Sequence, residues 1–221
     1  RWKESVLLWR QMNRRFLADW DGDPIPDANE EYLIYQSLVG TWPVTPLDEA
    51  AREAYCNRIV QYMEKGLREA KLHTSWMNPS EEYETRAFDF VRKILGPEAA
   101  AFQTDLTQFV AEIADAGFVN SLTQVLLKAT LPGAPDFYQG TELWDFSLVD
   151  PDNRRPVDYA ARQAALKLLT GSVERNLPGI ARELSEAWPD PRIKLLVTMR
   201  ALAVRRKFEQ LFACGDYLPL E

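Results

Sequence analysis

The stretch LPGAPDFYQGTELWDFSLVDPDNRRPVDY, residues 131–159, decides the fold of the chain. Proline and glycine at 132–135 end an apolar helix predicted before it, because proline cannot continue a helix and glycine favours turns. The next residues, DFY at 136–138, are a short extended run that Gly140 closes. We therefore predict a strand at 136–138, followed by a long polar loop.

The loop carries carboxylates, guanidinium groups and an aromatic ring within a few residues of the predicted strand end. This mixture suits a sugar, because charged groups with two oxygens or two nitrogens bind hydroxyl pairs and an indole stacks on the apolar face of a pyranose ring. The residues concerned are Glu142, Trp144, Asp145, Asp150, Asp152, Asn153, Arg154 and Arg155.

A second interpretation of the loop is purely structural. Acidic, proline-rich turns are common on protein surfaces, and residues 150–153 fit such a turn. Arg154 and Arg155 would then only neutralise the nearby acids. The residues alone leave both interpretations open.

Most of the remaining chain carries the three- and four-residue periodicity of amphipathic helices. Asp27 is placed to cap one helix, and Thr45, with Asp48 at the third helical position, is placed to begin a longer one. Gly117 is expected to separate two helices. Besides the helix after Asp27, the predicted helices are 2–20, 47–71, 80–95, 98–116, 120–131, 159–170, 178–187 and 191–212. The predicted fold class is mainly α, with very few strands.

Two further groups have both a functional and a structural interpretation. Tyr32, Tyr35 and Trp42 form either a sugar-facing stripe or part of the core. The run KLHTSW at 71–76 is unusual for a helix end. It contains His73, the chain's one histidine, and no set of cysteine, histidine or carboxylate at metal-ligand spacing accompanies it. We therefore predict neither a zinc site nor a cofactor.

Composition excludes several classes of protein. The net charge of -7 argues against a broad nucleic-acid surface but does not hinder binding of a neutral glucan. Two distant cysteines indicate free thiols and a cytoplasmic location rather than a disulfide framework. No run reaches the ~20 apolar residues that span a bilayer, and none has the pattern of a signal peptide.

Four stretches of the sequence closely resemble malto-oligosyltrehalose synthases, enzymes of glycoside hydrolase family thirteen. Besides residues 132–159, they are NEEYLIYQSLVGTWP at 29–43, REAKLHTSWMNPSEEYE at 68–84 and RIKLLVTMRALAVRR at 192–206. They cover nearly the whole chain and keep the order of the family. The resemblance implies a helical insertion at 1–116, the last elements of a (β/α)8 barrel at 117–212, and the start of a carboxyl-terminal β-domain at 213–221.

The resemblance also implies an activity for the parent protein. These synthases are intramolecular transglycosylases, classed as isomerases, that convert the reducing-end α-1,4 linkage of a malto-oligosaccharide into the α,α-1,1 linkage of trehalose biosynthesis. No residue here matches a catalytic position of the family, so we expect the segment to be inactive alone and do not assign Glu142 with Asp145 or Asp150 as a catalytic pair. Its expected partners are the malto-oligosaccharide and the remainder of its own barrel, with no nucleic acid and no membrane.

Arg154 is the leading candidate for sugar binding, because related glucosidases place an arginine ahead of a proline in this loop. In the family the helical insertion reaches toward the active-site cleft, which adds residues from 71–76; simple helix packing remains the other explanation for these. The further candidates are Tyr138, Gln139, Glu142, Asp150, Asp152, Arg155, Lys71, His73 and Trp76.

Two other functions remain open. The chain could belong to another α-glucan glucanotransferase or hydrolase of the same barrel family. It could also be a non-enzymatic helical interaction module in which residues 150–155 are a structured turn.

Overall fold

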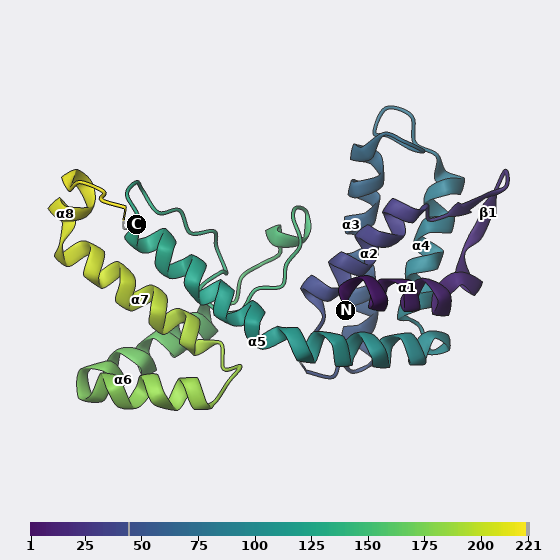
Figure 1. The fold of residues 1–221 in the computed structure, drawn as a ribbon. Coiled ribbons are helices and arrows are strands. Elements are labelled where there is room, and N and C mark those ends of the chain that lie inside the picture. The colour runs from purple at the N-terminus through teal and green to yellow at the C-terminus, as the bar shows by residue number, and fades with distance from the viewer. Residues whose placement is uncertain (44, 220–221) are drawn as a thin grey trace. The chain divides into compact units, whose positions relative to one another are not determined.

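Helices form most of the chain, as the sequence predicts, in a computed structural model that describes residues 1–43 and 45–219. The chain is divided into two compact units (Figure 1). The first unit comprises Arg1–Glu112 and Phe146–Arg155, and the second comprises Ile113–Asp145 and the chain from Pro156 onward. None of the described helices is both long and apolar enough to cross a lipid bilayer.

The first unit contains five helical segments and one short hairpin. Its helices are α1 (Trp2–Asn13), α2 (Ala28–Thr41), α3 (Glu49–Ala70), α4 (Glu81–Leu95) and the first part of α5 (Ala100–Thr130). The antiparallel hairpin joins β1 (Ala18–Trp20) to β2 (Asp23–Ile25). Single turns of 3-10 helix lie at η1 (Arg14–Phe16), η2 (Pro97–Ala99) and η3 (Asp152–Arg154).

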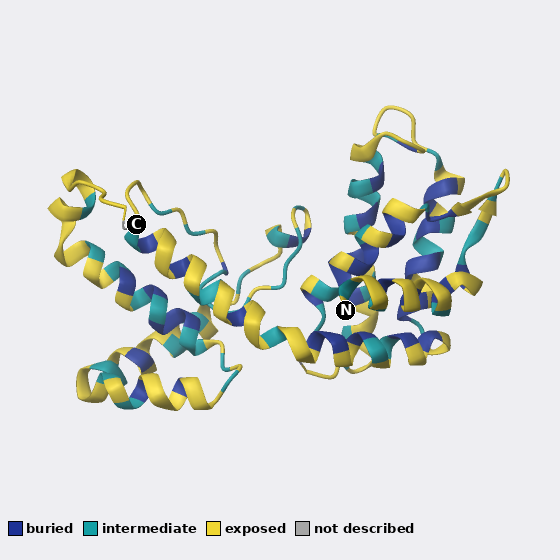
Figure 2. Ribbon diagram, viewed as in Figure 1, coloured by how far each residue is buried: buried dark blue, intermediate teal, exposed yellow. Residues whose placement is uncertain are grey.

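Trp9 is the centre of the core of the first unit. Its side chain is fully buried, and its ring meets those of Tyr35, Phe102 and Phe109 edge-on at centroid distances of 5.4–5.9 Å. The indole Nε1 donates to Asp105 Oδ1 at 2.6 Å, which satisfies its polar atom. One side chain of α1 therefore joins α2 and α5. Figure 2 shows buried residues along the inward faces of these helices.

The second unit has a smaller core. It contains the end of α5, then α6 (Tyr159–Glu186), α7 (Arg192–Lys207) and α8 (Glu209–Cys214). Helix α6 departs from helical geometry at Asn176, two residues before Pro178, so the predicted helices 159–170 and 178–187 are two segments that meet at this kink. Its core cluster consists of Leu169, Ile180, Leu184, Leu195 and Leu196.

The predicted strand at 136–138 is wrong. These residues have no regular secondary structure, and the hairpin β1–β2 contains the only strands among residues 1–43 and 45–219. A strand exists only where a neighbouring strand satisfies its amides and carbonyls, and no described segment pairs with this one. The strand-like composition of residues 136–138 was therefore not enough to make them a strand.

The predicted break at Gly117 is also wrong, because α5 runs without interruption from Ala100 to Thr130. A glycine inside a helix costs about 1 kcal/mol relative to alanine, which weakens a helix without ending it. The helix predicted at 2–20 ends at Asn13 instead, because residues 14–16 form the 3-10 turn η1 and Leu17 is extended before β1. Asp21 and Gly22 then adopt positive φ values in the turn of the hairpin.

Other boundaries shift by a few residues. Asp27 caps α2 as predicted, accepting from the amides of Asn29 and Glu30. Helix α3 is capped by Asp48, which accepts from the Ala51 amide, and not by Thr45. The helix predicted at 191–212 is interrupted at Phe208 between α7 and α8.

The predicted division at 116 and 212 into an insertion, barrel elements and a β-domain stays a prediction. Within 213–221, residues 213–214 belong to α8 and 215–219 have no regular structure. Residues 220–221 lie outside the described part of the chain.

Truncating the central tryptophan should destabilise the fold. We expect Trp9→Ala to lower the free energy of unfolding by about 3–5 kcal/mol, because it leaves a large cavity and an unpaired Asp105. The same change at Trp76, which is 55% exposed, should cost about 1 kcal/mol or less. Urea unfolding monitored by circular dichroism would measure both, and equal losses would contradict this role for Trp9.

Candidate functional site

The polar segment at 146–155 is held against helix α3 by a buried ion pair. Arg58 on α3 donates from Nε and Nη2 to the two carboxylate oxygens of Asp152, at 2.8 and 2.9 Å. Its Nη2 also donates to the carbonyl of Phe146 at 2.8 Å. Asp152 is only 4% exposed; its carboxylate also accepts from the Leu148 amide at 2.8 Å and forms an ion pair with Arg155 Nε at 2.9 Å. We call this group the Arg58–Asp152 anchor.

A second ion pair lies beside the anchor. Lys65 Nζ donates to Asp150 Oδ1 at 2.6 Å, and Arg154 Nη2 forms an ion pair with Asp150 Oδ2 at 2.8 Å. The Arg154 side chain is 69% exposed, whereas that of Lys65 is 22% exposed. Asp150 therefore joins a partly covered lysine to a solvent-facing guanidinium group.

Both carboxyl groups are held in the charged form. The hydrogen bond from Lys65 and the charge of Arg154 hold the pKa of Asp150 below its usual range. Burial alone would raise the pKa of Asp152, but the bonds from Arg58 and the Leu148 amide outweigh it, and its pKa is also lowered. Neither group is suited to donate a proton near neutral pH.

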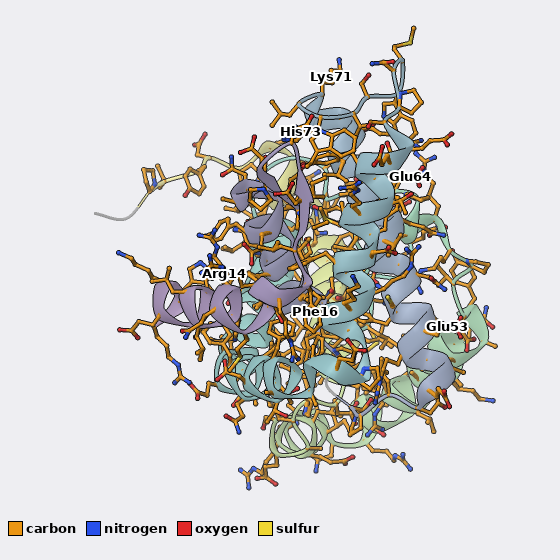
Figure 3. All side chains as sticks on the ribbon, turned by 90° about the vertical axis from the view of Figure 1, so that its right-hand side faces the viewer. Arg14, Phe16, Glu53, Glu64, Lys71 and His73 are labelled. Atoms are coloured by element: carbon orange, nitrogen blue, oxygen red, sulfur yellow. The ribbon has the colours of Figure 1, made fainter. Side chains whose placement is uncertain are left out.

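The connection between α3 and α4 presents an aromatic surface. Trp76 is 55% exposed, and the guanidinium of Arg68 lies over its ring at 4.8 Å from the centroid. Arg68 is fixed by two bonds to Glu84, at 2.8 and 2.7 Å, and Glu84 also accepts from the Thr74 hydroxyl at 2.6 Å. Lys71 ends α3 in the left-handed conformation, with φ of 56°. Figure 3 shows Lys71 and His73 at this end of the first unit.

The two groups lie along the same helix. Lys65, which binds Asp150, and Arg68, which supports Trp76, are three residues apart on α3, and residues at that spacing are neighbours on one helix face. The cation that binds the polar segment and the cation that lies against the exposed tryptophan are therefore neighbours on α3.

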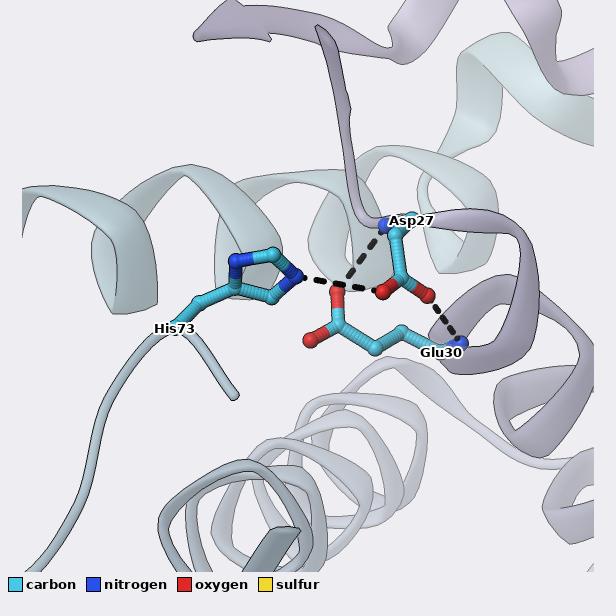
Figure 4. A group of neighbouring side chains, drawn as sticks. All are labelled: Asp27, Glu30 and His73. Atoms are coloured by element: carbon cyan, nitrogen blue, oxygen red, sulfur yellow. Dashed lines mark hydrogen bonds and ion pairs between the residues drawn. The ribbon is translucent and has the colours of Figure 1, made fainter. Parts of the chain in front are cut away.

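His73 lies in a different environment from Trp76. Its Nε2 lies 3.2 Å from Asp27 Oδ2, and its ring stacks on Tyr83 at 4.6 Å. Figure 4 shows this group with Glu30, whose Oε2 accepts from the Asp27 amide at 2.9 Å and from the Tyr83 hydroxyl at 2.5 Å. Burial raises the pKa of Glu30. His73 thus ties the α3–α4 connection to the start of α2.

Asp27, Glu30 and His73 offer possible metal-ligand atoms within 4.8 Å of one another, a grouping that the sequence did not reveal. Asp27 and Glu30 are 43 to 46 positions from His73, so no local spacing could show it. The capping box of α2 and the histidine bond account for the arrangement without an ion. We assign no metal to this group.

The remaining candidates belong to the second unit. Glu142 accepts from Arg162 Nε at 3.0 Å, and Arg162 Nη2 donates to the Gly140 carbonyl at 2.6 Å. The side-chain carbonyl of Gln139 accepts from the Tyr159 hydroxyl at 3.3 Å, and Tyr138 is 45% exposed. These contacts hold the first part of the polar loop to α6.

The sequence did not indicate the cations that hold these segments. Arg58, Lys65 and Arg68 on α3 and Arg162 on α6 lie in ordinary amphipathic helices. The one signal available was the seven-residue spacing of Arg58 and Lys65, which places both on one face of α3.

No protein-family model matches the chain. A Mycobacterium tuberculosis (strain H37Rv) protein that bears the name of maltooligosyl trehalose synthase is 39% identical over 198 residues, which cover 89% of this chain. The chain is homologous to one part of the maltooligosyl trehalose synthases. It spans 22% of the length of that relative.

Solved structures agree with this assignment. A crystal structure of maltooligosyl trehalose synthase matches the whole chain with a TM-score of 0.77 and 32% identity, over 28% of its own length. The maltooligosyltrehalose synthase of Arthrobacter ramosus matches 94% of the chain with a TM-score of 0.68 and 33% identity, over 24% of its length. The chain therefore corresponds to about a quarter of these synthases.

Acid should weaken the first unit in a predictable way. The pKa of Asp152 is lower in the folded state, so between its folded and unfolded pKa values the unfolded chain binds more protons. The contribution of Asp152 to stability should be complete above about pH 5 and be lost as pH falls below about 4. Urea unfolding at a series of pH values would measure this.

Asp152→Asn provides the control. The variant should lose about 2 kcal/mol at neutral pH, because the charged hydrogen bonds of Arg58 are weakened. It should also show a flatter decline in acid than the unsubstituted protein. An unchanged acid profile would mean that the anchor does not contribute to stability.

Proposed function

We propose that this chain is part of an enzyme that converts the reducing-end α-1,4 linkage of malto-oligosaccharides into an α,α-1,1 linkage, and that its first unit positions the sugar. The homology to maltooligosyl trehalose synthases supports the activity. The observation that carries the positioning role is the exposed Arg154, which is paired with Asp150. Arg68 on α3 lies against the ring of Trp76.

Arg154 and Asp150 have the chemistry needed to bind a pair of sugar hydroxyls. A guanidinium group donates in a fixed planar fork, and a neighbouring carboxylate accepts from a second hydroxyl. Arg154 is already oriented by its ion pair with Asp150, so it loses less conformational entropy on binding than a free arginine. This arrangement favours one orientation of the bound ring.

Trp76 supplies the apolar part of the site. Arg68 lies against the ring, and more than half of the residue is open to solvent. A pyranose stacks on such an indole through its C–H groups, which makes contact area with little ordering cost. We place a glucose unit of the malto-oligosaccharide on Trp76, with the polar contacts of Arg154 further along the glucan.

The role of these residues is positioning and not bond cleavage. Transfer to the anomeric hydroxyl competes with hydrolysis, so the released glucose has to be held near the reacting centre while water is kept out. Asp150 carries a lowered pKa and is paired with two cations, and Glu142 is paired with Arg162. These pairings support our proposal that the carboxylates that cleave the bond lie elsewhere in the protein.

Arg154→Ala in the full-length protein tests the polar contact. We expect the rate of trehalose-linkage formation to fall about 10-fold or more, because a charge-assisted hydrogen bond to the sugar is lost. Chromatography of products formed from maltopentaose measures transfer and free glucose together. Arg92→Ala is the matched control, since Arg92 also forms an exposed ion pair, with Asp89 on α4.

Unchanged transfer in Arg154→Ala would refute the proposed role. If the unsubstituted protein forms only α-1,4 products, the chain belongs to another α-glucan enzyme of the same barrel family.

Trp76→Ala tests the stacking contact. We expect KM for maltopentaose to rise about fivefold with little change in kcat, because a stacking interaction of about 1 kcal/mol is lost equally from substrate and transition state. Met77→Ala is the control, because Met77 is the next residue and is 95% exposed. The same KM in both variants would place the glucan elsewhere.

A further inference from the structure

We propose that Arg58 and Lys65 of α3 are positioning residues that hold the turn bearing Arg154 and so present its guanidinium group to the sugar. This inference rests on the proposed function of Arg154. Neither residue touches the sugar in this proposal; both act through the aspartates of the turn.

Each of the two cations binds one of the two aspartates. Arg58 and Lys65 are seven residues apart, so they lie on one face of α3, about 10 Å from each other along its axis. Asp152 and Asp150 flank Pro151 and bind Arg58 and Lys65 respectively. The turn is thus fixed to a rigid helix at two points rather than one, which restrains its rotation as well as its position.

Arg58 holds residues 146–155 at two places. Arg58 binds the carbonyl of Phe146, where the segment enters the first unit, and the buried carboxylate of Asp152. Asp152 begins the 3-10 turn η3, in which the Arg154 amide donates to the Pro151 carbonyl at 3.0 Å. The backbone of Arg154 is therefore only two residues from the anchored carboxylate.

The attachment through Lys65 controls the side chain of Arg154. Lys65 occupies Oδ1 of Asp150, and Arg154 binds Oδ2 of the same carboxylate. Because Lys65 fixes the plane of this carboxylate, it also fixes the direction from which Asp150 holds Arg154. Lys65 is itself close to Glu69 on the next turn of α3, at 3.9 Å.

The contacts that position residues 146–155 are largely distinct from the contacts that stabilise the core of the first unit. The core of the first unit is formed by apolar side chains of α1 to α5 and of η1, β2 and η2, and Leu148 packs against it. Asp150 and Asp152 are held by polar bonds to α3. Weakening these bonds should loosen the turn while the core stays folded.

The experiment uses the full-length protein and a double-mutant cycle. The single variants are Arg58→Lys, which keeps the charge but loses the two-pronged contact, Lys65→Met and Arg154→Ala. Each of the first two is also combined with Arg154→Ala. The control is Arg52→Lys, because Arg52 is an exposed arginine on the same helix. Transfer product, free glucose and melting temperature are measured for each.

We expect Arg58→Lys and Lys65→Met each to lower the ratio of transfer to hydrolysis about fivefold, through loss of orientation. The melting temperature should change by about 4 °C or less, since the core is untouched. In the Arg154→Ala background neither substitution should lower the ratio further, because both act through Arg154. Arg52→Lys should leave the ratio unchanged.

Other results overturn the inference in distinguishable ways. If transfer and hydrolysis fall equally as the protein loses stability, the two residues are only structural. If the effects add to that of Arg154→Ala, they act independently of it. If Arg154→Ala alone changes the ratio, the inference fails and the proposed function stands; if Arg154→Ala changes nothing, the proposed function itself fails. Should Arg58→Lys not fold, Lys65→Met and its double variant decide the question.

Discussion

The buried ion pair between Arg58 and Asp152 is the constraint on which the candidate site depends. Removing two charges from water costs several kcal/mol for each ion, and the cost is recovered only when every remaining polar atom finds a partner. Here the Asp152 carboxylate accepts from Arg58 and the Leu148 amide and forms an ion pair with Arg155, and Arg58 also binds the Phe146 carbonyl. A carboxylate so fully bonded permits one arrangement of its loop, and an irregular ten-residue segment acquires a defined place on α3.

Helix α3 contributes to the core with one face and to the site with another. Ile59, Met63 and Leu67 are buried in the core of the first unit. On the polar side, Arg58, Lys65 and Arg68 bind Asp152, Asp150 and Glu84 respectively. The same helix therefore fixes the turn that carries Arg154 and the arginine beneath Trp76. Because tight core packing holds α3 in one position, the polar side chains on its other face are also held in defined positions.

The similarity to solved synthases concerns the backbone more than the side chains. A TM-score of 0.77 at 32% identity means that the backbone is shared although most side chains differ. Cores tolerate hydrophobic exchange when volume and periodicity are kept. A paired charge tolerates much less, since removal of one partner leaves the other buried and unsatisfied. The helices of this chain therefore depend on its general pattern, and the candidate site depends on individual residues.

The sequence by itself determined the helical class, the cap of α2 at Asp27 and the crowding of charged groups before Pro156, because periodicity, capping and composition act over a few residues. Only the tertiary structure decided that residues 136–138 form no strand, that Gly117 does not end α5, and which cations hold the loop. Arg58 lies 94 positions from Asp152, and His73 lies 46 from Asp27. A strand needs a neighbour and an ion pair needs a partner, and both are properties of the folded chain in space rather than of any local stretch of sequence.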